Sequence, residues 1–498
     1  MMDTALDSRT VVERYKPLFM PQTVAVVGAS TSGSGRQNTF IRRIREMGYA
    51  GAIYPIHPTA GAIDGLPAYR SLAETPLPVD YALIAIAAAQ IPPLLAGAAG
   101  RVRFAQVISS GFAELDSGRE LQAALLKAAR DGGMRLLGPN CLGIYSPRGR
   151  ITFTEMKSWR AGHVGIASQS GGLGTDILRR GLNRGVSYSA VVTVGNCADI
   201  GVSDIVEYFL ADPETNVIGL YLESAAGGRR LFELLRAAGA RKPVVILKGG
   251  RTREGVAAAS SHTGSLAGDD RAWSALPRQT GCTVVNTLNE LIDALLIFQM
   301  LRPRAQPPAQ RIVLFGNGGG ASVLATDYFS TLGLKVLPFD AAAQTALRDL
   351  KLPAGASITN PVDCPAGALE HEDGRIAERI LEVIYRAGRP QILVMHLNLT
   401  PFVGRAKPGV IENLMQAVLR VQDRYPGQAH VALVLRSDGE ARLDELKRQV
   451  RQRATELGLP VFDELNDAGH ALAALGAYER FIWSRAQPQI TPHDTAAT

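Results

Sequence analysis

The sequence predicts an α/β protein made of three doubly wound parallel sheets. Short apolar runs rich in β-branched residues alternate with amphipathic helical segments from about Pro21 to Ser484, which is the pattern of strands and crossover helices. Three of these runs, beginning at Val24, Val164 and Ile312, end in a glycine-rich turn that leads into a helical segment. A chain of 498 residues is also too long for a single core, so we expect about three domains.

Composition and charge narrow the class of protein only slightly. Apolar residues make up 46% of the chain and charged residues 20%, which is ordinary for a globular protein and not for a disordered one. The net charge of +7 fits solvated helix faces, nucleic acid or an anionic cofactor. Because the basic residues follow helical patterns and do not gather beside aromatic residues, a nucleic-acid role rests on charge alone.

The cysteine spacing, together with the lack of a signal sequence and of a membrane span, predicts a cytoplasmic protein. The four cysteines are far apart and have neither CxxC spacing nor paired histidines, which favours reduced thiols and argues against a structural zinc site. The polar start of the chain lacks a secretory signal. Residues 81–100 carry no charge but contain two central prolines, so we interpret them as a strand, a turn and a helix start, not as a membrane span.

The first segment, 21–144, predicts one sheet with a ligand crevice. Expected strands lie at 24–27, 52–56, 81–87, 106–109 and 135–137, and expected helices at 38–47, 93–99 and 119–131. In a doubly wound sheet the turns after the strands meet in a single crevice at the carboxyl ends. The turn at 28–36 lacks the G-x-G-x-x-G spacing, and the second strand ends in Tyr54-Pro55-Ile56-His57-Pro58 without an acidic residue. We therefore expect phosphate at this helix start, beside Arg36, and not a nicotinamide dinucleotide.

The second segment, 162–300, predicts another sheet whose turns carry polar side chains. Its strands are expected at 164–167, 189–194, 217–222, 244–248 and 283–285. The first turn places Ser168-Gln169-Ser170-Gly171-Gly172 at a helix start, the second carries Asn196 and Cys197, and the third ends in Glu223. A hydroxyl-lined helix terminus, an amide and a carboxylate are thus expected at one edge of the sheet.

A loop of small residues around His262 follows the fourth of these strands. Neutral imidazole is well populated at physiological pH and is able to act as a nucleophile that takes a phosphoryl group. Glu223 is the expected carboxylate that orients it, although a solvated carboxylate at a strand end is the alternative. The loop itself has the alternative of a surface turn that caps the helix beginning near Asp269. We expect Cys197 to be an unreactive small side chain.

The proline-rich segment 303–310 is expected to link these sheets to a third. Residues 311–484 predict strands at 312–315, 335–337, 392–396, 431–435 and 460–462. The turn 316–320 opens the first helix of this segment, and 360–363 is expected to be a polar turn. Residues 485–498 are expected to form a disordered tail.

In combination, these motifs resemble the NDP-forming acyl-CoA synthetases, relatives of succinyl-CoA synthetase, from about Leu18 to Tyr478. Residues 261–268, Ser-His-Thr-Gly-Ser-Leu-Ala-Gly, resemble the phosphohistidine loop of the family, and 168–171 resemble its phosphate-binding helix start. The turn 28–36 and Gly138-Pro139-Asn140-Cys141 resemble the CoA-binding domain. Glu223 falls where the family keeps the carboxylate that steadies the histidine.

The resemblance implies a Rossmann-like CoA-binding domain at 1–150, a phosphohistidine-bearing flavodoxin-like domain at 151–302 and a second flavodoxin-like, ligase-CoA domain at 311–484. It implies the reversible conversion of acyl-CoA, phosphate and ADP into a carboxylic acid, CoA and ATP, through an acyl phosphate and a phosphohistidine at His262. The catalytic residues it implies are His262 and Glu223. The phosphate-binding residues it implies are Ser168, Gln169, Ser170, Gly171, Gly172, Asn196, Gly318 and Gly319. The CoA-binding residues it implies are Gly28, Ser30, Ser32, Gly33, Arg36, Pro55, Pro58, Ser110, Asn140 and Cys141.

One departure from the family concerns the nucleotide. No stretch remains for an ATP-grasp module, so the chain resembles an α subunit that needs a separate ATP-grasp β subunit, which would hold ADP or ATP with magnesium. We expect an oligomeric assembly, no metal on this chain, and neither nucleic acid nor membrane as a partner. Cys197 stands where relatives often carry lysine, so the acyl pocket differs and the acid is not determined by the resemblance. The choice between ADP and GDP is not determined either. A CoA-binding regulatory protein without turnover is the alternative, ahead of a nicotinamide-dependent oxidoreductase.

Overall fold

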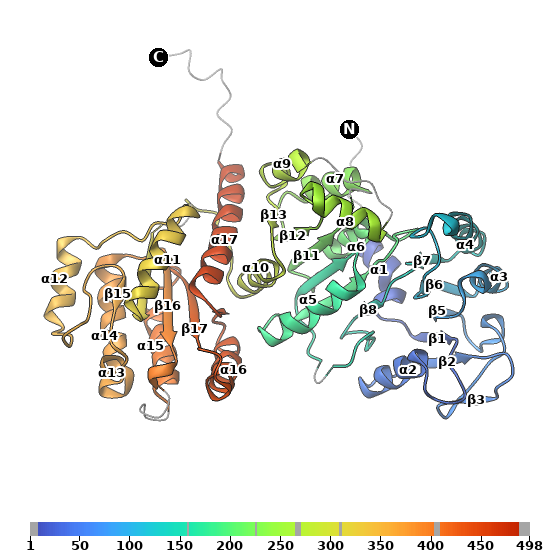
Figure 1. Ribbon diagram of the computed structural model, residues 1–498, viewed down its shortest axis with the longest axis horizontal. Coiled ribbons are helices and arrows are strands. Elements are labelled where there is room, and N and C mark those ends of the chain that lie inside the picture. Colours follow the sequence, from blue (N-terminus) through green and yellow to red (C-terminus); the bar gives the residue numbers. More distant parts are fainter. Residues whose placement is uncertain are drawn as a thin grey trace, which may run out of the picture. The chain divides into compact units, whose positions relative to one another are not determined.

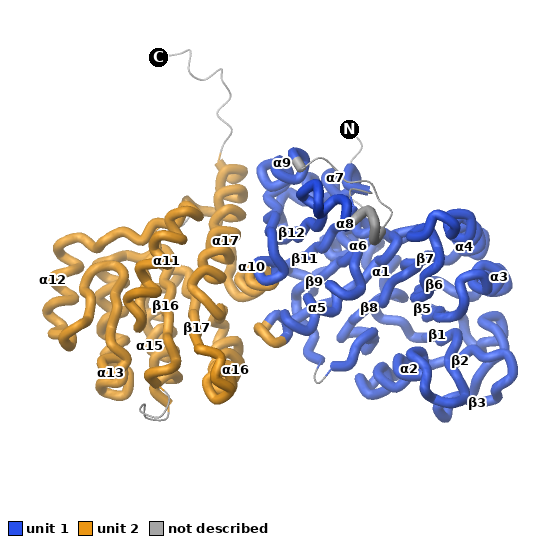
Figure 2. Tube along the Cα trace, viewed as in Figure 1, with its two compact units in different colours: residues 1–182, 186–291 blue, residues 183–185, 292–498 orange. Residues whose placement is uncertain are grey.

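A computed structural model describes residues 8–156, 159–224, 227–263, 270–307, 311–402 and 409–487, without the side chains of 259–263 and 270. The chain divides into two compact units (Figure 2). The N-terminal unit comprises residues 1–182 and 186–291, and the C-terminal unit comprises residues 183–185 and 292–498. None of the helices in the described segments is long and apolar enough to cross a membrane.

The first sheet of the N-terminal unit is fully parallel and has the strand order β2-β1-β5-β6-β7 (Figure 1). Its strands are β1 (Thr23–Val27), β2 (Ala52–Ile56), β5 (Val79–Ile84), β6 (Val102–Val107) and β7 (Arg135–Leu137). The other elements are a small hairpin, β3 (Ala62–Ile63) with β4 (Leu66–Pro67), and the helices α2 (Arg36–Glu46), α3 (Ile91–Ala96) and α4 (Arg119–Asp131). The order reverses between β1 and β5, which places the ligand crevice of such a sheet beside the turn after β1.

The second sheet has the order β13-β12-β11-β9-β10-β8. Its parallel strands are β9 (Val164–Ser168), β10 (Tyr188–Thr193), β11 (Val217–Leu222), β12 (Val244–Lys248) and β13 (Thr283–Val285). The helices around it are α5 (Gly171–Asn183), α6 (Val202–Ala211), α7 (Gly228–Ala238), α8 (Arg253–Thr263), α9 (Asp270–Thr280) and α10 (Leu288–Met300). The five parallel strands confirm the expected alternation.

An antiparallel edge strand, β8 (Gly143–Tyr145), was not expected from the sequence. It pairs with β10 and is fully buried, but three residues are too few to display a strand period. The backbone before it is bonded to the second sheet as well: the N–H groups of Asn196, Ala198 and Ile200 donate to carbonyls of Pro139, Gly138 and Leu136 at 3.0–3.1 Å. These hydrogen bonds therefore hold the turn after β7 against the turn after β10.

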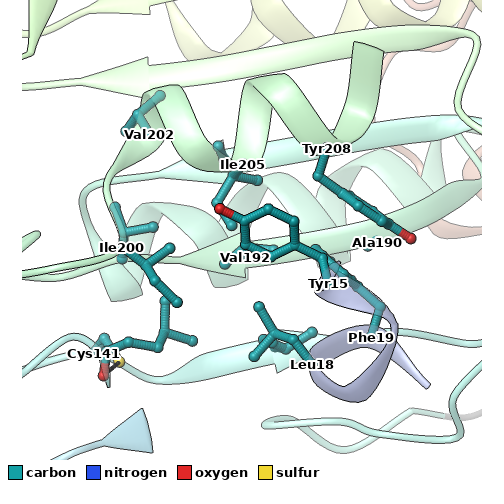
Figure 3. Packing of buried hydrophobic residues seen from close by; sticks show 14 of the residues in the cluster. Tyr15, Leu18, Phe19, Cys141, Ala190, Val192, Ile200, Val202, Ile205 and Tyr208 are labelled. Atoms are coloured by element: carbon teal, nitrogen blue, oxygen red, sulfur yellow. Dashed lines mark hydrogen bonds between the residues drawn. The ribbon is translucent and has the colours of Figure 1, made fainter. Parts of the chain in front are cut away.

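Helix α1 (Ser8–Phe19) was also not expected from the sequence. It buries Val11, Tyr15, Leu18 and Phe19. The ring of Phe19 stacks on Tyr208 of α6, with centroids 3.9 Å apart and planes at 7° (Figure 3). The Tyr15 hydroxyl donates to Asp204 Oδ1 at 3.3 Å. The start of the described chain is thus part of the core of the N-terminal unit.

The C-terminal unit has a third parallel sheet, with the order β15-β14-β16-β17-β18. Its strands are β14 (Ile312–Asn317), β15 (Val362–Asp363), β16 (Ile392–Asn398), β17 (His430–Arg436) and β18 (Val461–Phe462). Its helices are α11 (Gly319–Thr331), α12 (Ala341–Asp349), α13 (Ala366–Leu369), α14 (Arg375–Val383), α15 (Val410–Arg424), α16 (Ala441–Glu456) and α17 (Leu465–Ala486). Counted in chain order, all three sheets share the arrangement 2-1-3-4-5 for their parallel strands.

Two expectations for this third sheet are wrong. The expected strand at 335–337 makes only an isolated bridge between Lys335 and Arg311, and the expected polar turn at 360–363 supplies the edge strand β15. The side chain of Asn360 explains the exchange: its Nδ2 donates to the carbonyl of Ile312 at 2.7 Å, and its Oδ1 accepts from the N–H of Leu314 at 3.1 Å. These bonds hold the segment against β14.

The expected linker contacts the rest of the C-terminal unit, and the expected tail begins within a helix. The backbone N–H of Arg304 donates to the Glu479 carboxylate at 2.8 Å, so the described part of 303–310 contacts the C-terminal unit. Helix α17 continues through Ala486, into the segment expected to be a disordered tail, whose remainder from 488 lies outside the described residues. The division into three domains stays a prediction.

Candidate active site

A cavity of about 590 Å³ lies in the N-terminal unit, where the carboxyl ends of strands from both of its sheets meet. Turns after β6, β7, β9, β10 and β11 contribute its walls. The predicted site residues that line it are Arg36, Ser110, Asn140, Cys141, Gln169, Ser170, Gly171, Gly172, Asn196 and Glu223. The structure therefore brings residues expected to bind CoA and residues expected to bind phosphate into one space.

The turn after β9 presents the start of α5 to this cavity. Ser168 is completely buried, and its hydroxyl donates to the carbonyl of Ser170 at 2.7 Å, so it shapes the turn and does not line the cavity. Helix α5 begins at Gly171, and a Cβ added at Gly172 would meet nothing within 4 Å. Open space in front of the first amides of a helix is a favourable position for an anion such as phosphate.

Gln169 ties the turn after β9 to the turn after β11. Its Oε1 accepts from the backbone N–H groups of Glu223 and Ser224, and its Nε2 donates to Ser224 Oγ at 3.1 Å. The predicted phosphate-binding role of Gln169 is not tested by these contacts. They give Gln169 a definite structural role, which is to hold Glu223 beside the helix start.

Glu223 is fixed by the strand ends around it. Its carbonyl accepts from Lys248 Nζ at 3.0 Å, and that ammonium lies 5.7 Å from the ring centroid of Trp273. Burial raises the pKa of the Tyr221 hydroxyl. The negative charge of Glu223, with which the hydroxyl is hydrogen-bonded, raises this pKa further. His262 belongs to helix α8, but its side chain lies outside the described residues. The pairing of His262 with Glu223 stays a prediction.

Glu114 is a cavity residue that sequence reasoning missed. Its Oε1 accepts from the N–H groups of Gly111 and Phe112, and its Oε2 accepts from Asn196 Nδ2. Burial acts to raise the pKa of Glu114, but the hydrogen bonds from Asn196 and the backbone outweigh it, so the pKa lies below the usual value. The signal was available, since the turn after the strand 106–109 was already expected in the crevice.

The two cysteines of the cavity are poor nucleophiles. Burial raises the pKa of Cys197 to about 11 and that of Cys141 to about 12, so both thiols stay protonated at neutral pH. This agrees with the expectation that Cys197 is unreactive. Cys197 has a φ of 53° and lines the cavity next to Gly195.

The turn after β1 is arranged largely by its own polar groups. The hydroxyls of Ser30, Ser32 and Ser34 form a chain with oxygen separations of 2.9 and 2.8 Å, and the Ser30 N–H donates to Asn38 Oδ1 at 2.8 Å. Gly28 has a φ of 96°, and a Cβ there would meet the carbonyl oxygen of Ala85 at 2.5 Å. Of the predicted CoA residues, the following do not line the cavity: Gly28, Ser30, Ser32, Gly33, Pro55 and Pro58. Their contact with CoA stays a prediction.

The third glycine-rich turn, at the start of α11, carries a carboxylate. Asp363 Oδ1 accepts from the N–H of Gly318 at 2.7 Å, and a Cβ on Gly319 would lie 2.9 Å from Asp363 Oδ2. A phosphate bound by Gly318 and Gly319 would therefore share this helix start with a negative side chain. Both residues belong to the C-terminal unit, and their part in the site stays a prediction.

His396, in the strand beside this turn, predicts a measurable pH dependence. Burial, with a smaller effect of the positive Arg436, lowers the pKa of His396 from 6.5 to about 4, and its Nε2 lies 2.9 Å from Ser322 Oγ. Between these two pH values the unfolded chain binds a proton that the folded chain does not, so stability is full above pH 6.5 and is lost as the pH falls towards 4. We expect a loss of about 3 kcal/mol, measured as the free energy of unfolding, and a much smaller loss in His396→Gln. Equal pH dependence in both proteins would contradict the assignment.

Comparison with known proteins gives the class to which this fold and cavity belong. The CoA-binding domain family matches residues 22–147, and the family described as the succinyl-CoA ligase like flavodoxin domain matches residues 161–298. The two matches cover the two sheets that meet at the cavity. They define a CoA-binding protein of the succinyl-CoA ligase type.

Relatives along the whole chain define the family more closely. The α subunit of ADP-forming acetate–CoA ligase II from Pyrococcus furiosus is 30% identical over 464 residues, which cover 92% of this chain and 96% of that one. The ADP-forming acetate–CoA ligase I of Archaeoglobus fulgidus is 35% identical over 350 residues, 70% of this chain and 50% of that one. The dinucleotide forming acetyl-coenzyme A synthetase 1 of Ca. Korarchaeum cryptofilum, solved with phosphate and ADP, has a TM-score of 0.81 at 27% identity and covers 95% of this chain and 99% of that chain. This chain belongs to the family of NDP-forming acyl-CoA synthetases.

Proposed function

We propose that this chain is the α-type subunit of an NDP-forming acid–CoA ligase. It interconverts acyl-CoA, phosphate and ADP with a carboxylic acid, CoA and ATP. The observation that carries the proposal is one shared cavity, because it is lined both by turns of the CoA-binding domain and by the start of α5, where helix amides favour an anion. A thioester and a phosphate that occupy these two regions would lie next to each other. The regulatory alternative is not favoured, since the relatives are named as ligases.

We propose that the reaction has two steps. A phosphate oxygen held at the start of α5 attacks the thioester carbonyl carbon, the C–S bond breaks, and the CoA sulfur leaves and takes a proton. The product is an acyl phosphate. A ring nitrogen of His262 then attacks the phosphorus, the bond to the acyl oxygen breaks, and the carboxylate leaves. Glu223 orients the imidazole and stabilises its positive charge, while helix amides stabilise the negative charge of the phosphoryl group.

The nucleotide step needs a second polypeptide in this proposal. The Pyrococcus relative is called subunit alpha. The match to the longer Archaeoglobus relative covers 50% of that protein, so half of its length has no counterpart in the match. We propose a separate ATP-grasp β subunit that binds ADP or ATP with magnesium and accepts the phosphoryl group from His262. An oligomeric assembly and a location in the cytoplasm stay predictions.

The proposal is tested by phosphoryl labelling of the full chain. The protein is incubated with radiolabelled phosphate and a panel of acyl-CoA thioesters, and the intact mass and the labelled peptide are then determined. We expect an acid-labile phosphoryl group on His262 with at least one thioester, and the thioester that works identifies the acid. Absence of label both from the chain alone and from the chain with its β subunit, despite CoA binding, would contradict the proposal and favour the regulatory alternative.

A further inference from the structure

The side-chain amide of Asn196 has a fixed orientation in the cavity. Its Nδ2 donates to Glu114 Oε2 and to Gln122 Oε1, the latter at 3.2 Å. Both acceptors are anchored by backbone donors, since Glu114 Oε1 accepts from two backbone N–H groups and Gln122 Oε1 accepts from the N–H of Ala113 at 3.3 Å. A carboxylate is able only to accept. Asn196 must therefore direct its N–H groups at Glu114 and Gln122.

This orientation leaves the oxygen of Asn196 as the polar atom available to a ligand. Asn196 Oδ1 accepts from Asn140 Nδ2 at 3.4 Å, which is long for a hydrogen bond. The backbone of Asn196 is also fixed, because its N–H donates to the carbonyl of Pro139 at 3.0 Å. The cavity wall thus presents a preoriented acceptor in the same cavity that Arg36 and the start of α5 line.

An acceptor at this point does not suit the role expected for Asn196. Phosphate, acyl phosphate and carboxylate groups meet proteins mainly through oxygens that accept hydrogen bonds, and the amide oxygen has nothing to donate to them. Among the reactants of the proposed function, CoA offers an amide N–H in its cysteamine arm, next to the thiol. This N–H is a stronger donor than the thiol itself.

We propose that Asn196 Oδ1 accepts a hydrogen bond from the cysteamine amide N–H of CoA, and that Glu114 and Gln122 are positioning residues that hold Asn196 in this orientation. The inference rests on the proposed function, because it names the part of the substrate that this wall of the cavity recognises. It makes Asn196 a residue that selects and aligns the thioester arm, with the sulfur directed towards the start of α5.

The test compares CoA with an analogue in which the cysteamine amide is replaced by an ester, so that the N–H becomes an oxygen. Binding of both ligands to the full chain is measured by calorimetry. We expect the analogue to bind the unaltered protein about tenfold more weakly than CoA, because Asn196 Oδ1 loses the donor that CoA supplies. In Asn196→Ala the affinity for CoA falls by about the same factor, and the ratio between the two ligands approaches one.

Glu114→Gln tests the positioning role separately. A glutamine amide is able to donate as well as accept, so Asn196 gains the freedom to turn its N–H towards the cavity, where the ester oxygen is able to accept it. We expect the ratio to fall in Glu114→Gln because the analogue binds better, a change that a merely structural defect does not produce. Glu120→Gln, an exposed glutamate in the first turn of α4, is the matched control and keeps the ratio of the unaltered protein.

Each ratio compares two ligands on the same protein, so a partial loss of folded protein cancels. A ratio in Asn196→Ala equal to that of the unaltered protein would overturn the inference. A fall in Asn196→Ala but not in Glu114→Gln would overturn the positioning role of Glu114. If the unaltered chain binds neither CoA nor the analogue, the proposed function fails and the inference fails with it, which is a different result from equal binding of the two ligands.

Discussion

Replacement of His262 with alanine is expected to lower ATP formation by roughly a thousandfold or more, because it removes the ring nitrogen proposed to accept the phosphoryl group. The measurement is turnover of acyl-CoA, phosphate and ADP by the chain together with the proposed β subunit. In the proposed mechanism the first half of the reaction uses the cavity and not the imidazole. Formation of acyl phosphate from acyl-CoA and phosphate, trapped with hydroxylamine, should therefore continue in the variant, as should CoA binding.

The control for this variant is His371→Ala. His371 is an exposed histidine in a short 3₁₀ segment (His371–Gly374) of the C-terminal unit, and its replacement should leave ATP formation unchanged. Full turnover by His262→Ala would mean that ADP attacks the acyl phosphate directly. Loss of acyl phosphate formation in the same variant would instead give the histidine a part in the first step.

Replacement of Phe19 with alanine is expected to destabilise the N-terminal unit by about 4 kcal/mol. Phe19 is 1% exposed, stacks on Tyr208 and also meets the ring of Phe209 with centroids 6.1 Å apart, so its removal leaves a cavity between α1 and α6. The measurement is the free energy of unfolding from denaturant titration, with limited proteolysis to show whether α1 is released first.

The matched control lies on the same helix. Lys16 has a side chain 49% exposed and forms only a surface ion pair with Glu13, so Lys16→Ala should change the free energy of unfolding by less than about 0.5 kcal/mol. Similar effects of the two substitutions would mean that α1 does not contribute to the core through its apolar face.

The main architecture was predictable because buried parallel strands form short, largely apolar runs without charged residues. Val164–Ser168 and Val217–Leu222 are fully buried strands, and their apolar runs are unmistakable in the sequence. The elements that were missed depend on distant partners. Strand β8 is defined by β10, strand β15 by the side chain of Asn360, and helix α1 by the aromatic residues of α6. No local pattern in the sequence contains those partners.

The site divides in the same way. The turn residues from Gln169 to Gly172 and Glu223 were predictable, since carboxyl-end turns of one sheet must meet. Glu114 was predictable on the same ground, because it lies in the turn after the strand 106–109. Gln122 was not, because it lies on helix α4 and reaches the site through its contact with Asn196 of the other sheet. The direction of the Asn196 amide is a property of that network and not of the residue. Sequence reasoning therefore identified Asn196 as a site residue but assigned it to phosphate on resemblance alone.

The hydrogen bonds that join the turns after β7 and β10 have a consequence for the order of events during turnover. The bonds from Asn196, Ala198 and Ile200 to the segment 136–139 fix the turns after β7 and β10 against each other before any ligand binds. Saturation with CoA should then follow simple one-step kinetics, with no slow isomerisation of the two sheets preceding it. A conformational change that carries a phosphoryl group to the nucleotide should then leave the turns after β7 and β10 in place and involve other segments.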